Sequence, residues 1–351
     1  MKELYIDKIR GSLMAGAAGD ALGYAVEFIS RSAILKRYGA DGITTFALEE
    51  SGKAIISDDT QMTLFTANGL LNAATTATPY IDAITDAYVD WYYTQSAWGN
   101  KRGTHCWLSD IDELYALRAP GNTCLSALKA IVANQTPSNN SYGCGGIMRV
   151  APIALYGAAE HRMTIEEVVR LAGDAAEVTH KHPLGFLSAA LFAAFIYRVM
   201  PLTPAEVTAN STALVEECLE VVDRVYQGKH QVDIDSLKHL THRAIDLTTS
   251  DKSDAECIRH LGEGWVGDEA WAIALYCTLR HLDSVERAII AAVNHDGDSD
   301  YTGSICGNVM GAIYGYKHIR ERNIFCPTGH ELEQTLELAE VILKVANELA
   351  K

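Results

Sequence analysis

Two stretches, GSLMAGAAGDALG at residues 11–23 and GSICGNVMGAIYG at residues 303–315, place a glycine or an alanine at every fourth position. That spacing keeps the small residues on one stripe of a helix, although each glycine inside a helix costs about 1 kcal/mol relative to alanine. Such a stripe is typical of a helix backbone that approaches a neighbour very closely. Either the two helices pack on each other, or each packs on an unrelated neighbour. The first arrangement would bring Asp20 together with the acidic segment 296–300.

The rest of the chain also predicts helices. Capping boxes, in which Ser, Thr or Asp is followed three residues later by Glu, predict helix starts near residues 165, 204, 254 and 284, after Thr164, Thr203, Ser253 and Asp283. Apolar periodicity predicts further helices over 4–22, 60–73, 81–93, 123–133, 184–197, 234–247, 269–282, 302–319 and 331–349. The best strand-like run, 43–46, is short. Because no Pro/Gly/Ser-rich linker divides the chain, the sequence predicts one all-α domain over 1–351.

Composition excludes several classes of protein. The 351 residues carry 29 Lys+Arg against 45 Asp+Glu, a formal charge of −16, so the surface repels nucleic acid and anionic lipid. Eight scattered cysteines without a C-x-x-C pair indicate reduced thiols. Glu3 and Asp7 lie where a signal peptide is positive, and no apolar run is long enough to span a membrane. We therefore expect a cytoplasmic protein with no nucleic-acid or membrane partner.

Two acidic segments, SDDT at 57–60 and DGDSD at 296–300, each directly precede a predicted helix. Capping of the helix accounts for one aspartate, but not for two or three that repel one another unless a cation lies between them. Carboxylates and hydroxyls with no nearby His or Cys favour Mg²⁺ or Mn²⁺. An EF-hand is excluded, because Tyr301 and Gly307 stand where its glycine and bidentate glutamate belong.

The segment YGCGGIMR at 142–149 is rich in glycine. Backbone N–H groups of such a loop at a helix N-terminus can hold a phosphate, and Arg149 would add positive charge. An ordinary tight turn accounts for the same glycines. No Walker motif, dinucleotide fingerprint or nucleophile elbow accompanies the loop.

Together these motifs resemble the ADP-ribosylglycohydrolase family, whose members include dinitrogenase-reductase-activating glycohydrolases and ADP-ribosylarginine hydrolases. The matching segments are 16–27 (GAAGDALGYAVE), 57–61 (SDDTQ), 143–152 (GCGGIMRVAP), 179–183 (THKHP), 261–270 (LGEGWVGDEA) and 295–315. The resemblance implies a compact orthogonal helical domain of that family's type. It also implies two Mg²⁺ or Mn²⁺ ions.

Carried over position by position, the resemblance implies a site. The implied metal ligands are Ser57, Asp58, Asp59, Thr60, Asp298 and Asp300. The implied catalytic carboxylates are Glu27, Asp59 and Asp300. The implied substrate-binding residues are Gly143, Cys144, Gly145, Gly146, Arg149, His182 and Tyr301. Six acidic residues are accordingly expected around bound cations, namely Glu27, Asp58, Asp59, Asp296, Asp298 and Asp300.

One position departs from the family pattern. Family members usually place Ser or Thr after D-x-D, and this chain has Tyr301 followed by Thr302. Either the metal site loses a ligand, or Thr302 replaces it through a shift, or Tyr301 lines the substrate cleft.

The activity implied by the resemblance is hydrolysis of the bond between ribose C1 and arginine in an ADP-ribosylated protein, with that protein or ADP-ribose as the partner. A second interpretation is a weakly catalytic or non-catalytic ADP-ribose-binding or immunity protein that blocks a cognate ADP-ribosyltransferase, and Tyr301 is its main support. A third is a hydrolase of another ADP-ribose derivative, such as a serine-linked or nucleotide-linked one. The sequence does not choose among these linkages.

Overall fold

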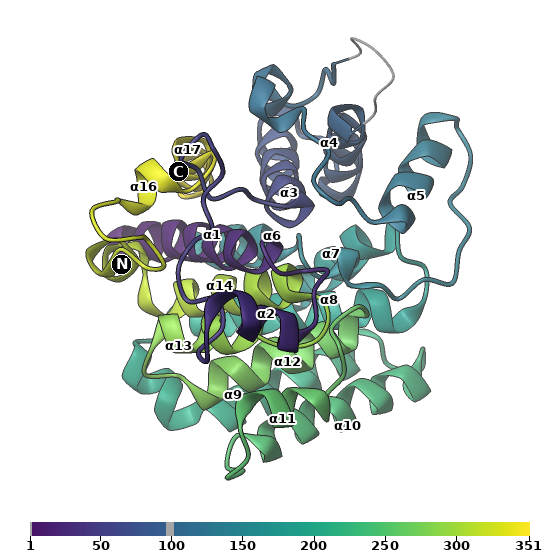
Figure 1. The fold of residues 1–351 in the computed structure, drawn as a ribbon. Helices are drawn as coiled ribbons and strands as arrows, with labels where there is room; N and C mark the ends of the chain where they lie inside the picture. Colours follow the sequence, from purple (N-terminus) through teal and green to yellow (C-terminus); the bar gives the residue numbers. More distant parts are fainter. Residues whose placement is uncertain (1, 96–101) are drawn as a thin grey trace.

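The computed structural model describes residues 2–95 and 102–351, and every regular element of that part is helical (Figure 1). The α-helices are α1 (Lys2–Tyr24), α2 (Arg31–Tyr38), α3 (Asp58–Thr76), α4 (Tyr80–Gln95), α5 (Asn122–Val132), α6 (Ala151–Ala158), α7 (Ile165–Glu177), α8 (Pro183–Val199), α9 (Pro204–Val225), α10 (Gln231–Leu247), α11 (Asp254–Arg259), α12 (Gly267–Arg280), α13 (Val285–Val293), α14 (Ser299–Tyr314), α15 (Tyr316–Arg322), α16 (Leu332–Thr335) and α17 (Ala339–Leu349). Short 3₁₀ helices are η1 (Trp107–Asp110), η2 (Asp112–Leu114), η3 (Cys144–Gly146) and η4 (Ala159–His161). The all-α prediction is confirmed.

Three of the four predicted capping boxes are present. At Thr164, Thr203 and Ser253 the hydroxyl accepts a hydrogen bond from the third helical N–H, and the carboxylate of the glutamate at that position accepts one from the backbone N–H of the cap residue. The fourth prediction was wrong by one residue: Ser284, not Asp283, caps α13, because its Oγ accepts from the backbone N–H of Arg287. Short-range cap chemistry therefore set these helix starts.

Two predicted long helices are each divided in the structure. The helix expected over 302–319 ends at Gly315, whose φ of 81° lies outside the helical range, and α15 begins at the next residue. The helix expected over 331–349 becomes α16 and α17, separated by a turn in which Leu338 has a φ of 56°. The segment 43–46 forms no strand within the described residues. Instead Asn294 holds the backbone of Ile43 through its side chain.

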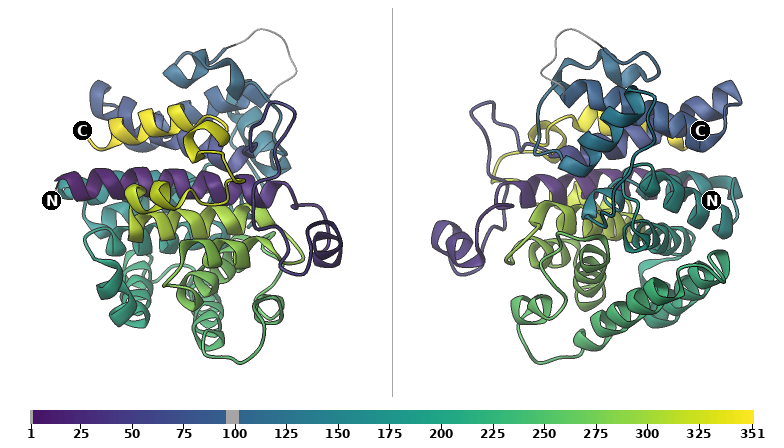
Figure 2. Two further views of the ribbon diagram at one scale, coloured as in Figure 1. Left: turned by 60° about the vertical axis from the view of Figure 1, so that its left-hand side comes forward. Right: turned by 90° about the vertical axis from the view of Figure 1, so that its right-hand side faces the viewer.

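The two glycine stripes face each other along an antiparallel pair of helices. Figure 2 shows α1 as a long purple helix with the yellow-green α14 beside it. A Cβ added to Gly19 would fall within 3.0 Å of the carbonyl oxygen of Gly303, and a Cβ added to Gly311 would do the same at Gly11. Real Cβ atoms essentially never come so close. The packing of the two stripes on each other is thus confirmed, and it brings the end of α1 to the start of α14.

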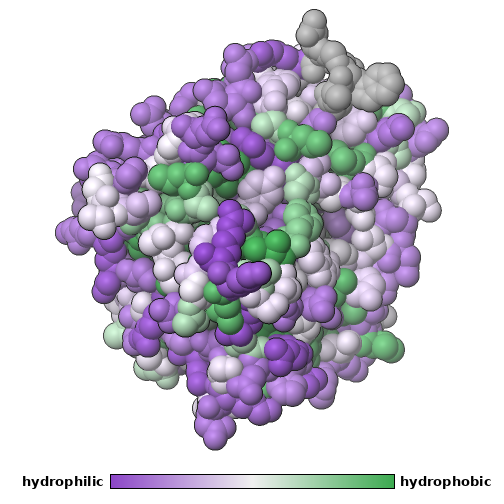
Figure 3. All heavy atoms as spheres, viewed as in Figure 1, coloured by the Kyte–Doolittle hydropathy of each residue, from purple (hydrophilic) through white to green (hydrophobic). Residues whose placement is uncertain are grey.

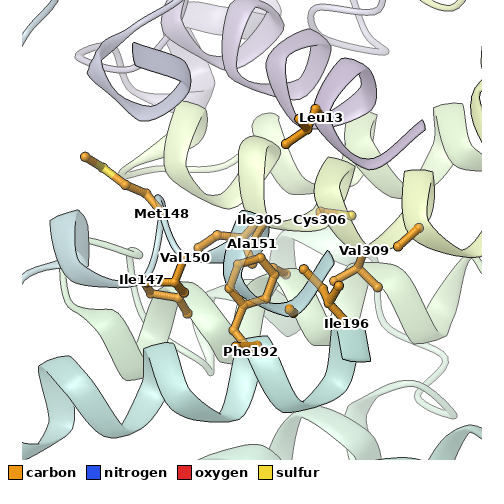
Figure 4. Close-up of a cluster of buried hydrophobic side chains, with 14 of the residues drawn as sticks. Leu13, Ile147, Met148, Val150, Ala151, Phe192, Ile196, Ile305, Cys306 and Val309 are labelled. Atoms are coloured by element: carbon orange, nitrogen blue, oxygen red, sulfur yellow. The ribbon is translucent and has the colours of Figure 1, made fainter. Parts of the chain in front are cut away.

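The residues after the glycine-rich loop anchor that loop in the core. Figure 4 shows Ile147 and Val150 close to Phe192 of α8 and Ile305 of α14. All four side chains are fully buried, and burial of each contributes about 1.5–3 kcal/mol. The C-terminal end of the loop at 143–146 is therefore fixed to the core.

The helices of the molecule include no candidate membrane-spanning segment in the described ranges. No helix in the described ranges is both long enough and apolar enough to cross a membrane. The face in Figure 3 is mostly hydrophilic, with a few small hydrophobic areas.

All eight cysteines are free, and seven of them are buried, as the scattered spacing predicts.

Candidate metal centre

The two acidic segments converge at one end of the α1–α14 pair. Ser57 caps α3, with its Oγ accepting from the N–H of Asp59, and Asp58 and Asp59 form the first turn. Asp298 and Asp300 stand at the N-terminus of α14. Glu27 follows α1, and one oxygen each from Glu27, Asp298 and Asp300 lies within 4.8 Å of the others. We call Glu27, Asp58, Asp59, Asp298 and Asp300 the acidic cluster.

Most oxygens of the acidic cluster lack a hydrogen-bond partner. Among the described residues, the buried oxygens without one include Glu27 Oε2, Asp58 Oδ1 and Oδ2, Asp59 Oδ1 and Oδ2, Asp298 Oδ1, and Asp300 Oδ1 and Oδ2. A buried carboxylate without a partner is costly unless a cation balances it. Oxygen ligands in this number suit a hard divalent ion. The cluster is therefore an arrangement that could bind a metal ion.

Burial and mutual repulsion raise the pKa values in the acidic cluster. Burial, followed by the charges of Asp300 and Asp58, raises the pKa of Glu27 to about 10. Burial and the charge of Asp300 hold the pKa of Asp58, Asp59 and Asp298 well above the usual range for aspartate. These groups favour their protonated forms when no cation is bound, and a cation would reverse that preference.

Asp20 belongs beside the cluster, although the sequence indicated only that it would come near. It is fully buried in α1. Its oxygens accept from the N–H of Ser57 at 2.9 and 3.1 Å, from the N–H of Thr60 at 3.2 Å, and from the hydroxyl of Thr60. Asp20 therefore holds the start of α3 in place. Thr60, expected as a metal ligand, donates its hydroxyl hydrogen to Asp20, which leaves the lone pairs of its oxygen available for a cation.

Asp296 lies outside the cluster. It is exposed, and its Oδ1 accepts from the backbone N–H of Arg31 at 2.8 Å, at the start of α2. The expectation that Asp296 surrounds a cation was therefore wrong: a helix start gives this carboxylate its partner.

The structure argues against one of the three alternatives for Tyr301, the one in which Thr302 replaces the missing metal ligand. The hydroxyl of Thr302 lies 2.7 Å from the carbonyl oxygens of Ala292 and Asp298, so it is used within the fold and does not replace a metal ligand. Tyr301 is 5% exposed. Burial, and then the charge of Asp58, hold the pKa of its phenol well above the usual value. Tyr301 is therefore a buried side chain that lies next to the acidic cluster.

The glycine-rich loop is tied to the segment that precedes α12. Cys144 donates its N–H to Trp265 O at 3.2 Å, and Gly267 donates to Tyr142 O at 2.8 Å. The amide of Cys144 is therefore occupied within the protein. The thiol of Cys144 lies 3.0 Å from Asp298 Oδ2. Cys144 was expected only as a substrate-binding residue, and the fold places its thiol beside an acidic residue.

Arg149 does not reach the loop surface where a phosphate was expected. Its side chain is fully buried, and its Nη2 donates to Ala175 O at 2.9 Å and to Thr179 Oγ1 at 2.7 Å. The guanidinium also lies over the ring of Tyr88, 4.2 Å from the centroid. Arg149 is a core residue that joins α4 and α7.

Two histidines support the loop from α8 and the turn before it. His182 caps α8, with its Nδ1 accepting from Leu184 N–H at 3.2 Å, and its ring lies 4.8 Å from that of Tyr142. His180, which the sequence did not single out, is buried beneath Gly145. Burial and the charge of Arg149 lower the pKa of His180 to about 3.

A hollow of about 740 Å³ is lined in part by Glu263 and Trp265, and the carbonyl oxygen of Glu263 accepts from the backbone N–H of Asp298 at 2.8 Å. Tyr142 and Trp265 bring aromatic rings to it, and Arg31 and Arg259 bring positive charge. The exposed ring of Phe28, directly after Glu27, stacks on Trp265 with 6.3 Å between centroids. Flat rings and cations are the groups that recognise a base and a phosphate.

Comparison with known proteins gives a consistent family. Residues 1–350 match the model of the ADP-ribosylglycohydrolase family. The chain is 23% identical to the ADP-ribosyl dinitrogen reductase glycohydrolase of Rhodospirillum rubrum over 320 residues, which cover 89% of this chain and 87% of that protein. It is 25% identical to ADP-ribosylhydrolase ARH3 of Mus musculus over 203 residues, 53% of each protein, so it spans about half the length of that relative. A solved structure described as an ADP-ribosylglycohydrolase-related protein complex is similar in fold, with a TM-score of 0.58, 20% identity, and coverage of 99% of this chain and 98% of that one.

Proposed function

The chain belongs to the ADP-ribosylglycohydrolase family, and on that premise we propose that it hydrolyses the bond between ADP-ribose and an arginine of a modified protein. The observation that carries the proposal is the convergence of unpartnered, buried carboxylates from α3 and α14. Structural carboxylates do not need this arrangement, whereas a bound cation does. We further propose two ions, Mg²⁺ or Mn²⁺, held by Ser57, Asp58, Asp59, Thr60, Asp298 and Asp300.

The reaction breaks the bond from ribose C1 to the arginine nitrogen. The oxygen of a water molecule, with one of its hydrogens, ends on C1, and the other hydrogen ends on the nitrogen. Positive charge develops on the ribose ring as this bond lengthens, and carboxylates beside the ring stabilise it. Divalent ions, when bound, supply the positive charge that orients the ribose hydroxyls and makes a water molecule more acidic.

The residues of this chain divide the remaining work. Glu27 stands at the edge of the acidic cluster, 5% exposed, where it can take a proton from water and return it to the leaving nitrogen. Asp59 and Asp300 are the alternative proton carriers. The loop from Gly143 to Gly146 and His182 border the diphosphate, and the rings of Tyr142 and Trp265 contact the base.

The nearly full-length similarity to a protein named for ADP-ribosyl dinitrogen reductase supports an ADP-ribosylated protein as the substrate, and the choice of arginine follows the family resemblance of the sequence motifs. Shorter matches to proteins named ARH3 favour a test of other linkages as well. The eight free cysteines support a reducing compartment, and we propose the cytoplasm.

The test measures free ADP-ribose released from protein modified on arginine and, separately, on serine, with Mg²⁺ or Mn²⁺ present. We expect release from the arginine substrate, and at least a 100-fold loss, on the order expected for removing one group that stabilises the transition state, in Asp58→Asn and Asp298→Asn. Asp86→Asn, an exposed carboxylate on α4, is the matched control and keeps full activity.

Three results would overturn the proposal in different ways. Full activity in the presence of a chelator would remove the metal-dependent mechanism. Release from serine alone would assign a different linkage. A wild-type protein without activity that nevertheless blocks an ADP-ribosyltransferase, equally well after loss of Asp58 and Asp298, would assign the binding function.

A further inference from the structure

Cys144 is the thiol that the fold brings to the acidic cluster. Its Sγ lies 3.0 Å from Asp298 Oδ2, and the residue is 7% exposed. In the described part of the chain, it is the one cysteine of eight whose sulfur lies within hydrogen-bond distance of a carboxylate. By contrast, Cys306 has a threonine hydroxyl near its sulfur, and Cys257 a backbone carbonyl.

The backbone on both sides holds this thiol in position. The N–H of Cys144 donates to Trp265 O, and Cys144 itself begins the 3₁₀ turn η3. The next residue, Gly145, packs so tightly on Cys124 and His180 that an added Cβ would lie 3.0 Å from each. The loop therefore has little freedom to turn the sulfur away from Asp298.

The oxygens around the sulfur lack partners. Asp298 Oδ1 and both oxygens of Asp59 and of Asp300 are buried without a hydrogen bond from the described residues. Typical bonds from a divalent ion are about 2.1 Å to oxygen and about 2.3 Å to sulfur. Two atoms 3.0 Å apart, such as Cys144 Sγ and Asp298 Oδ2, are thus spaced as neighbouring ligands of one ion.

We propose that Cys144 Sγ is a ligand of the cation held by Asp298, so that the centre is a mixed carboxylate and thiolate site. The proposal rests on the metal site of the proposed function, but not on which linkage is hydrolysed. Sulfur ligands select softer ions, so Cys144 strengthens the binding of Co²⁺ and Zn²⁺ relative to Mg²⁺. On binding, the S–H bond is replaced by a sulfur–metal bond, and the proton leaves to water.

The experiment adds Co²⁺ to the metal-free full chain and records the near-ultraviolet charge-transfer band that a sulfur ligand gives to cobalt. We expect the band in the wild type and in Cys277→Ser, a fully buried cysteine of α12 that serves as the matched control. Cys144→Ser loses the band and loses about 10-fold in Co²⁺ affinity, the lower end of the range seen when groups around a metal are altered. Its Mg²⁺ affinity, measured by calorimetry, falls by a smaller factor than its Co²⁺ affinity, because Mg²⁺ gains little from a sulfur ligand.

The outcomes separate this proposal from the proposed function. If calorimetry shows Co²⁺ bound to the wild type without the band, or if the band survives in Cys144→Ser, Cys144 is no ligand, while hydrolysis of the arginine substrate still supports the activity. If the wild type binds no Co²⁺ and releases no ADP-ribose, both proposals fail. Circular dichroism checks the fold of each variant, and Cys144→Ala replaces Cys144→Ser if the serine variant does not fold.

Discussion

The buried carboxylate of Asp90 and the buried carboxylates of the acidic cluster differ in their hydrogen-bond partners. Asp90 of α4 is fully buried, and its oxygens accept hydrogen bonds from the three consecutive backbone N–H groups of 104–106 and from the hydroxyl of Ser109. Asp59 of α3 is equally buried, yet its oxygens accept none from the described residues. Burial is the same in both places, and only the supply of partners differs.

The difference shows what each group does. Asp90 fastens the segment after α4 to that helix, because each hydrogen bond to a buried amide removes the cost of leaving the amide unpaired. In the acidic cluster most of the buried carboxylate oxygens have no hydrogen-bond partner among the described residues, which is the mark of a site kept for a ligand. Four measurements of unfolding free energy test this contrast.

The largest effect is expected for Asp90→Ala, which leaves three amides without an acceptor. We expect the free energy of unfolding to fall by about 4 kcal/mol, in the range for breaking a buried polar network. Denaturation with urea measures it. Asp86→Ala, exposed one turn earlier on α4, changes stability by less than about 0.5 kcal/mol. Equal losses in the two variants would show that Asp90 is not special.

The next effect is stabilisation by a cation. A ligand at 100 times its dissociation constant stabilises the folded state by about 2.7 kcal/mol, so Mn²⁺ should raise the unfolding free energy of the wild type by that amount over a sample with chelator. Asp59→Asn should show little of this increase, because it loses one of the cluster's carboxylates. An unchanged increase in Asp59→Asn would contradict the assignment of the cluster as the metal site.

His180 is a buried titratable side chain near the glycine-rich loop. It is almost fully buried, and its Nδ1 lies 2.9 Å from Thr179 Oγ1. Its pKa is lowered from 6.5 to about 3, so between these values the unfolded chain binds a proton that the folded chain does not. Stability contributed by His180 is therefore lost as the pH falls through this window, by about 1.4 kcal/mol per pH unit. His180→Gln removes that slope. A stability difference between the two proteins that does not change with pH would contradict the prediction.

The smallest effect has the opposite sign. In metal-free protein Asp59→Asn should raise the unfolding free energy by about 1 kcal/mol, because it removes a buried carboxyl that the folded protein must keep protonated at a cost in free energy. Asp90→Asn should lower it, since the amide has one acceptor oxygen where the carboxylate has two. Parallel urea denaturation in a chelator compares them. If Asp59→Asn were also destabilising, the cluster would contribute to the fold as Asp90 does.

Much of the fold was predictable because its signals are local. Thr164, Thr203 and Ser253 begin helices through contacts with residues three positions away, and such contacts can be seen in a short stretch of sequence. The ends of helices were less predictable. Leu338 adopts a left-handed conformation that favours glycine, so its residue type gave no sign of the break between α16 and α17. The pairing of the glycine stripes was an open alternative until the close approach of Gly19 and Gly303 decided it.

The candidate site was predictable in its acidic residues and less so in their neighbours. The resemblance named Asp58, Asp59 and Asp298, and the structure brings them together. Arg149 was expected at the loop and lies in the core, because a guanidinium near a glycine-rich loop looks the same in sequence whichever way it turns. For Asp20 the sequence predicted only that it would come near the acidic segment 296–300. Nothing local shows that its carboxylate accepts a hydrogen bond from the backbone N–H of Ser57.

The sequence by itself determined the helical class, the glycine stripes, the helix caps and the two acidic segments, because each depends on residues within one or two turns of one another. Only the tertiary structure decided which carboxylates lack partners and which thiol lies beside them. Whether a buried oxygen is satisfied depends on donors far away in the chain, as Asp90 and Asp59 show. For the same reason Cys144 and Asp298, 154 residues apart, become neighbours only after folding.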